Sequence, residues 1–265
     1  MHASVVDSFV AFTQPLEGKV LWPYLDVLGL VTVGYGCLID PLPLAERISW
    51  KLPNGLPASL EAVRADWTRL KARKDLAKVH FKFAAAVTSI RLTEEGAGDL
   101  LRLRAASFEV ELKKHLPSWD SFPADAQLCC MSMAWACGPG FPITFKNFAK
   151  FANLHDWANA AKCAAIRTEG NPGIVPRNAQ NSLCMVNAAA SAARGLPVDQ
   201  LFWPQTVPLS GAPTVTAPAS DDALRMLALQ ALALHPIDTL GQAGRDIAEH
   251  DTLRGDPNDN DPANA

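Results

Sequence analysis

Apolar and polar positions change their spacing several times along the first part of the chain, and each change predicts a different element. Residues 4–13 repeat apolar side chains at helical spacing, with Ser4 suited to cap the helix and Pro15 expected to disturb its end. Residues 19–40 are rich in β-branched and aromatic side chains punctuated by glycine, which predicts a small antiparallel hairpin or meander. Residues 41–57 are rich in proline and predict a loop.

Helical spacing dominates the rest of the body. An apolar stripe predicts a helix over residues 59–78, and Thr93 before two glutamates predicts the start of a helix that runs to about His115. The mostly apolar stretch from Asp125 to Cys137 predicts a buried central helix. The elements together predict an α+β class that is mostly α, with a small antiparallel sheet near the front. Three further helices are expected over residues 144–152, 155–166 and 177–194.

The composition changes after about residue 203. Residues 204–220 are rich in Pro, Ser and Thr and predict a linker. Residues 221–265 form an acidic tail that begins with an amphipathic helical stripe; a second short helix is expected over 239–250 and disorder over 255–265. The tail holds nine acidic and three basic residues, so the rest of the chain carries a net charge of +3. A mildly basic body is compatible with an anionic polymer as partner.

The overall composition limits the class of protein. The chain has 265 residues, 49% hydrophobic and 19% charged, which is typical of a globular protein. A net charge of −3 argues against a protein that coats nucleic acid. The sequence has neither a long apolar run nor a signal-peptide pattern, so we expect synthesis in the cytoplasm without a cleaved signal. Six cysteines without zinc-site spacing are expected to be reduced thiols, mostly in the core: Cys37, Cys129, Cys130, Cys137, Cys163 and Cys184.

The stretch between residues 17 and 36 is the most informative for chemistry. Glu17 is expected at the end of a helix, Asp26 at a hairpin turn, and Thr32 on the returning strand. Two carboxyl groups and a hydroxyl group can therefore converge where the helix meets the sheet, as glycoside hydrolysis by an acid/base pair requires. The spacing alone leaves ordinary roles open: a solvated helix-end carboxylate, a turn-capping aspartate and a strand threonine.

The same stretch matches a longer pattern. Glu17-Gly18 is followed, in one register without gaps, by Tyr24, Asp26, Gly29, Thr32, Gly34 and Gly36. This pattern resembles the phage-type lysozymes, the muramidases typified by the lysozyme of T-even bacteriophages. The resemblance covers about residues 5–195 and leaves out an insert-like segment, residues 41–90, and everything after about 203. It continues at Leu92 to Glu95, at Trp135 to Gly138, at Phe145, at Trp157 and at Gly173 to Arg177.

The resemblance implies a fold and a set of catalytic residues. The fold would have two lobes within a catalytic domain over residues 1–203: an N-terminal lobe with the sheet and a helical C-terminal lobe. Glu17 would be the general acid, and Asp26 the second carboxylate, which positions water or stabilises positive charge on the sugar. Thr32 would hold the attacking water. The family chemistry implies neither a cofactor nor a metal.

The resemblance also implies residues that bind the substrate. Backbone at Gly34 and Gly36 would lie close to the glycan, which suits residues without a side chain. Trp135 matches an aromatic residue that lines the cleft. Arg177 matches a basic residue on its far side, and the neighbouring Asn178 takes that place in another register.

Two positions depart from the family. Cys37 stands where the family often has His, and the acid that pairs with that His should fall near Arg104, where no acid is present. Because both partners are replaced, we expect this stabilising ion pair to be missing rather than half formed.

The implied reaction is hydrolysis of the β-1,4 bond between N-acetylmuramic acid and N-acetylglucosamine, with peptidoglycan glycan strands as the partner. The enzyme would reach the periplasm and cell wall as a phage endolysin released through a holin, or as a secreted antibacterial effector. In the second setting the tail is a candidate contact for a delivery or inhibitor protein. Neither a nucleic-acid partner nor stable membrane insertion is expected. The alternative is a lysozyme-fold protein that binds glycan or a partner without catalysis.

Overall fold

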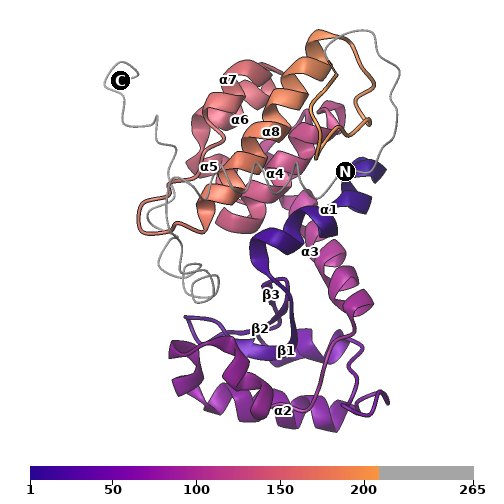
Figure 1. The fold of residues 1–265 in the computed structure, drawn as a ribbon, viewed down its shortest axis with the longest axis vertical. Coiled ribbons are helices and arrows are strands. Elements are labelled where there is room, and N and C mark those ends of the chain that lie inside the picture. The colour runs from indigo at the N-terminus through magenta and orange to yellow at the C-terminus, as the bar shows by residue number, and fades with distance from the viewer. Residues whose placement is uncertain (209–265) are drawn as a thin grey trace. The chain divides into compact units, whose positions relative to one another are not determined.

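The computed structural model describes residues 1–208 of the chain, which form two compact units. One unit consists of residues 9–107 and contains the sheet; the other consists of residues 1–8 and 108–208 and is helical. This confirms an α+β protein that is mostly helical with a small antiparallel sheet (Figure 1). The helices and disorder expected beyond residue 208, and most of the expected linker, lie outside the described residues.

Helix α1, Ala3–Glu17, runs further than the sequence predicts, because Pro15 lies inside it rather than ending it. Proline lacks the N–H that would bond to the preceding turn, which is why a disturbed end was expected. The last turn nevertheless closes, since the Gly18 N–H donates to the Gln14 carbonyl at 3.0 Å. The helix ends when Gly18 adopts a left-handed φ of 70°, a conformation that glycine accepts readily.

The expected meander is a three-stranded antiparallel sheet in the order β1-β2-β3. Its strands are β1 (Val20–Leu25), β2 (Val31–Gly34) and β3 (Cys37–Leu38). Tyr24 pairs with Thr32, and the register between β1 and β2 is irregular. Paired residues on one strand face place their side chains together, so Tyr24 and Thr32 lie side by side.

The insert-like segment 41–90 folds within the sheet-containing unit. It contains three 3-10 helices, η1 (Leu42–Arg47), η2 (Lys74–Lys78) and η3 (Phe81–Ala86), and the helix α2 (Leu60–Ala72). The expected loop 41–57 therefore contains a helical turn. The expected helix 59–78 is broken at Arg73, whose ψ of 60° is not helical. Ser59 caps α2 by accepting the Ala62 N–H at 3.2 Å.

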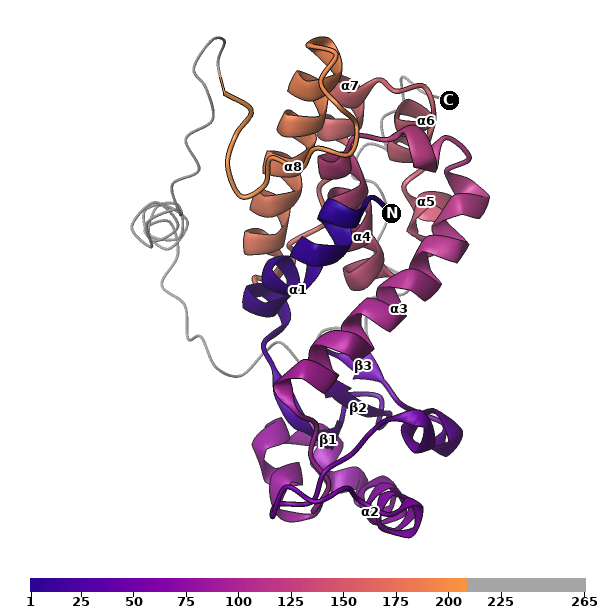
Figure 2. The ribbon, with the colours of Figure 1, turned by 90° about the vertical axis from the view of Figure 1, so that its right-hand side faces the viewer.

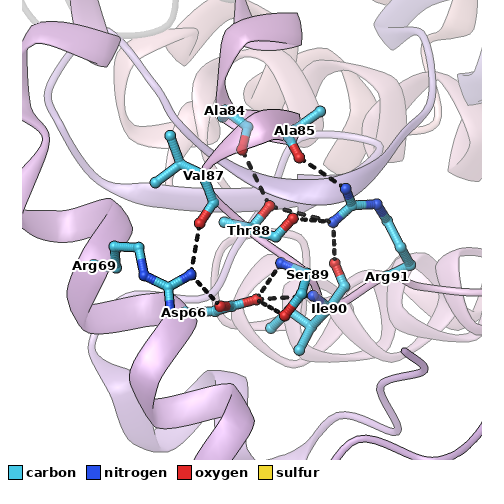
Figure 3. A network of polar contacts seen from close by, with 9 residues as sticks. All are labelled: Asp66, Arg69, Ala84, Ala85, Val87, Thr88, Ser89, Ile90 and Arg91. Carbon is cyan, nitrogen blue, oxygen red and sulfur yellow. Dashed lines mark hydrogen bonds and ion pairs between the residues drawn. The ribbon is translucent and has the colours of Figure 1, made fainter. Parts of the chain in front are cut away.

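A buried carboxylate fastens α2 to the chain that leaves the insert-like segment (Figure 3). Asp66 is 1% exposed, and its Oδ2 accepts the main-chain N–H groups of Ser89 and Ile90. Its Oδ1 accepts from Arg69 at 2.9 Å. The Arg91 guanidinium group donates to the main-chain carbonyls of Ala85, Thr88 and Ile90. Buried polar groups that are satisfied in this way fix α2 in one position.

The helical unit is built around α4, Ala124–Cys137, whose residues are almost all buried as expected. Helix α4 lies side by side with α8, Ile174–Ala193 (Figures 1 and 2). Helix α8 begins earlier than expected because Pro176 is accepted in its first turn. The expected helix over 155–166 is limited to six residues, capped by Asp156. The other helical segments are α3 (Glu94–His115), η4 (Trp119–Ser121), α5 (Phe141–Thr144), α6 (Lys146–Asn153) and α7 (Trp157–Lys162).

The start of the expected linker is packed on the helical unit. Val207 is 7% exposed, and its N–H donates to Asn187 Oδ1 at 3.0 Å. The Asn187 side chain also donates to the Gln205 carbonyl at 2.7 Å. Its buried amide thus finds partners in the residues after 203, so the first residues of the predicted linker are packed.

The cysteines are free thiols, and all but Cys137 are buried, as the sequence predicts. Within residues 1–208, no helix is both long and apolar enough to cross a membrane.

Candidate active site

Glu17 ends α1 and faces the turn between β2 and β3. A Cβ atom built at Gly36 would lie 3.7 Å from Glu17 Oε2. Gly36 has a left-handed φ of 79° and lies in that turn. The carboxyl group of the expected general acid therefore lies beside backbone of the sheet, at van der Waals distance from the position of the missing Gly36 side chain.

Asp26 occupies the turn after β1, as expected. Its Oδ1 accepts the N–H of Leu28 at 2.9 Å and of Leu30 at 2.8 Å. Burial raises the pKa of the Asp26 carboxyl, and these two N–H groups and the charge of Lys71 oppose the rise. The side chain thus has a structural task in the turn and remains an acid in a partly desolvated place.

Both candidate carboxyl groups act on Tyr24. This tyrosine is 8% exposed, and its pKa is raised first by burial, then by the negative charges of Glu17 and Asp26. Coulombic coupling weakens with distance and with screening by water, so a buried tyrosine responds to nearby charges more than an exposed one. Tyr24 pairs with Thr32, and β1 leads directly into the Asp26 turn, so these three residues lie in one part of the sheet.

Thr32 lies across from Tyr24 in the sheet and is 4% exposed. Its Oγ1 donates a long hydrogen bond of 3.4 Å to the Leu30 carbonyl. A bond of that length is weak, so the hydroxyl can turn to a stronger acceptor at little cost. The structure thus brings Glu17, Asp26 and Thr32 into one unit, around a tyrosine.

Cys37 and Arg104, the two positions that depart from the lysozyme pattern, influence each other electrostatically. Cys37 is 2% exposed, and burial raises the pKa of its thiol to about 12. The positive charge of Arg104 opposes that rise, and the negative charge of Glu17 adds to it. Burial therefore keeps the Cys37 thiol neutral, at a position where the phage-lysozyme pattern often has His, and the charges of Arg104 and Glu17 act on its pKa in opposite directions.

Gly34 and Gly36 have different neighbours at the positions where a side chain would begin. A Cβ at Gly34 would lie 3.8 Å from the Cβ of Ala97 and 3.9 Å from Leu92. Gly34 therefore faces the start of α3, and its φ of 70° is a second reason for glycine. Gly36 instead faces Glu17. Close approach of their backbone to a glycan stays a prediction for both.

The remaining candidates, Trp135 and Arg177, belong to the helical unit. The Trp135 ring lies 5.6 Å from that of Phe108. Arg177 is 3% exposed and donates to the carbonyl and the hydroxyl of Ser132 on α4. The alternative, Asn178, uses its side-chain amide to accept from and donate to the main chain of Ile166. Contact of these residues with substrate stays a prediction.

The arrangement offers two carboxyl groups in different surroundings, which is the requirement for dividing acid and base roles. Within residues 1–208, no group of three or more His, Cys, Asp or Glu side chains is placed to hold a metal ion. Tyr24 belongs to the sequence motif, but the motif predicts no role for it. Sequence reasoning missed Lys71, because nothing in the spacing of α2 indicates that this lysine reaches the Asp26 turn.

No protein-family model matches the chain, and a search of the curated proteins finds no significant match.

Proposed function

We propose that the chain is a peptidoglycan muramidase of the phage-lysozyme type. The observation that carries the proposal is the placement of Glu17 Oε2 beside Gly36 in the β2–β3 turn, in the same unit as Thr32 and the Asp26 turn. The match of Glu17, Asp26 and Thr32 to the lysozyme pattern supports the same assignment. The substrate is the glycan strand of peptidoglycan, and the two compact units correspond to the two lobes of a lysozyme.

In the proposed reaction, Glu17 donates a proton to the oxygen of the β-1,4 bond between N-acetylmuramic acid and N-acetylglucosamine. Asp26 works as a carboxylate that orients water or stabilises positive charge on the sugar. Thr32 turns its weakly bonded hydroxyl to that water. Within the sheet-containing unit, backbone at Gly34 and Gly36 is the proposed glycan contact. Within the helical unit the proposed contacts are Trp135 and Arg177, and Arg177 must release Ser132 to reach substrate.

The proposed place of action is the bacterial cell wall. The enzyme acts on the cell wall either after release through a holin, as an endolysin, or after delivery as a secreted antibacterial effector. The residues beyond 208 are the candidate contact for a delivery or inhibitor protein.

The test is release of dye from labelled, purified peptidoglycan by the full chain and by Glu17→Gln. Glutamine keeps the shape of Glu17 but cannot donate the proton, so activity is expected to fall at least a hundredfold. Glu95→Gln is the matched control, because Glu95 is an exposed carboxylate of the same unit. Mass spectrometry of the released fragments identifies the bond that is cut.

A second function is a lysozyme-fold protein that binds glycan without cutting it. The observation that favours it is that Asp26 Oδ1 accepts two main-chain N–H groups of its own turn. An aspartate with a purely structural role in a turn makes the same hydrogen bonds. A folded wild type that sediments with peptidoglycan but releases no fragments would establish this function. Equal hydrolysis by the wild type and Glu17→Gln would mean that another group is the acid.

A further inference from the structure

The insert-like segment 41–90 falls outside the lysozyme resemblance, yet one of its side chains contacts the turn that contains Asp26. Lys71 lies in the last turn of α2. Its Nζ donates to the main-chain carbonyl of Gly29 at 2.6 Å and to Asp40 Oδ2 at 2.5 Å. Gly29 is part of the Asp26 turn, since its N–H donates to the Asp26 carbonyl at 2.9 Å. Helix α2 therefore holds this turn from outside the hairpin.

Asp40 connects Lys71 to β2, the strand that follows the turn. Its Oδ2 accepts the N–H of Val31, the first residue of β2, at 3.1 Å. Lys71 and Asp40 thus bridge the carbonyl of Gly29 and the N–H of Val31. On the inner side, the Asp26 carboxylate accepts the N–H groups of Leu28 and Leu30. The backbone that positions Asp26 is held from both sides.

The position of Lys71 is fixed because α2 is itself fixed. The buried Asp66 network ties one side of the helix to the chain around Ser89 (Figure 3). Trp67 Nε1 donates to the carbonyl of Ile39 at 3.2 Å, next to Asp40. The ammonium group of Lys71 lies 5.9 Å from the centre of the Trp67 ring. These contacts restrain a long side chain that would otherwise lose much rotamer freedom.

The contact of Lys71 with the Asp26 turn also has an electrostatic effect on the Asp26 carboxyl group. Asp40 is a like charge that raises the pKa of Asp26, and Lys71 is an opposite charge that lowers it. Tyr24, on β1, stays neutral because its pKa is raised. The side chains of Lys71 and Asp40 are 34% and 13% exposed, so water screens them only in part. Without Lys71, the Asp26 and Asp40 carboxylates would both bind the backbone of residues 28–31 with no ammonium group bonded to Asp40 or to the turn.

We propose that Lys71 is a positioning residue for Asp26. Lys71 holds the turn that contains Asp26 and places a positive charge near its carboxylate. The proposal rests on the proposed function, in which Asp26 works in its ionised form. The insert-like segment then serves the reaction, although it lies outside the lysozyme pattern.

The experiment compares the full-length wild type with Lys71→Met, Lys71→Arg and Asp40→Asn. Carbon-13 NMR titration of the Asp26 carboxyl gives its pKa without any substrate, and peptidoglycan hydrolysis against pH gives the catalytic profile. Lys71→Met is expected to raise the Asp26 pKa and to lower hydrolysis on the acid side of the profile about three- to tenfold. Lys71→Arg should restore most of the loss. Asp40→Asn should move the Asp26 pKa in the opposite direction.

Lys74→Met is the matched control, because Lys74 is an exposed lysine just beyond α2. It should leave the Asp26 titration and the acid side of the profile unchanged. The proposal is overturned if Asp26 titrates identically in the wild type and in Lys71→Met. If Lys71→Met does not fold, Lys71→Gln, which also removes the positive charge, decides: an unchanged Asp26 pKa in that variant contradicts the proposal.

The two proposals can fail separately. A wild type without hydrolytic activity sinks the muramidase assignment and with it the catalytic purpose of Lys71, whereas the NMR titration still decides whether Lys71 controls Asp26. An active wild type in which Lys71→Met shifts neither the titration nor the profile sinks the positioning role alone.

Discussion

Gly36 and Glu17 come from different elements, and the missing side chain of Gly36 leaves room beside the Glu17 carboxyl group. The Cβ that Gly36 lacks would lie 3.7 Å from Glu17 Oε2, an ordinary contact distance. A methyl group therefore fits there, but it displaces water from the carboxyl. The space beside Glu17 is thus a property of the turn between β2 and β3.

Gly36→Ala is accordingly expected to weaken both stability and hydrolysis. Its left-handed φ should cost about 1–2 kcal/mol of the free energy of unfolding. A methyl group against the Glu17 carboxyl group takes up space beside the proposed acid and should reduce hydrolysis roughly tenfold. Gly55→Ala is the control, because Gly55 has a φ of 82° and no atom within 4 Å of its Cβ position. Urea denaturation should show similar losses for both variants; an equal loss of hydrolysis in Gly55→Ala would refute the specific role of Gly36.

The pH dependence of activity should reflect the Asp26 carboxyl. Burial raises its pKa above the ordinary value of 3.8, so the ionised form appears only at higher pH. If catalysis needs the carboxylate, the acid limb of the hydrolysis profile has its midpoint above 3.8. A midpoint at or below that value would contradict the assignment.

The free energy of unfolding should also depend on the protonation of Asp26. A raised folded-state pKa means that the folded chain binds more protons than the unfolded chain from about pH 3.8 upward. The Asp26 contribution to stability is therefore present below the unfolded pKa and is lost as pH rises through the folded pKa. Asp26→Asn keeps an acceptor for Leu28 and Leu30 but does not titrate. As pH rises through this range, the urea midpoint of the wild type should fall relative to that of Asp26→Asn. A constant difference between the two midpoints would argue against a raised Asp26 pKa.

The Cys37 thiol should be inert towards alkylation in the folded protein. Burial raises its pKa to about 12, so almost no thiolate exists at neutral pH, and the side chain is 2% exposed. Cys137, which is partly exposed, should react first with iodoacetamide. Peptide mass spectrometry after timed labelling measures both rates. Labelling of Cys37 as fast as Cys137 would show that the turn opens readily.

Local signals explain which parts of the fold were predictable. The end of α1 at Glu17 and the turn at Asp26 depend on glycine conformation and on hydrogen bonds between near neighbours, and both are visible in a short stretch of sequence. The extension of α1 through Pro15 was not predictable, because the gain from tertiary packing offsets the lost hydrogen bond.

Contacts between distant residues explain what the sequence did not reveal. Lys71 reaches Asp40 across 31 positions, and Asp125 reaches Trp203 across 78. No period or spacing relates such pairs, since each depends on how whole elements pack. For the same reason, the sequence predicted that the site holds Glu17, Asp26 and Thr32 but not that Tyr24 lies where their surroundings meet.

Asp125 should be the strongest single anchor of the chain end that packs on the helical unit. It is fully buried at the start of α4, and its carboxylate accepts from the N–H groups of Phe202 and Trp203 and from the Asn187 amide. Asp125→Ala leaves these donors without an acceptor and should cost about 2–4 kcal/mol of the free energy of unfolding. The exposed Asp7 in the same unit is the control, and Asp7→Ala should change stability by less than about 0.5 kcal/mol. Urea denaturation measures both, and limited proteolysis should cut near residue 203 faster in Asp125→Ala. A loss no larger than that of Asp7→Ala would mean that the segment after α8 is held by its apolar contacts, with Val207 the first side chain to examine.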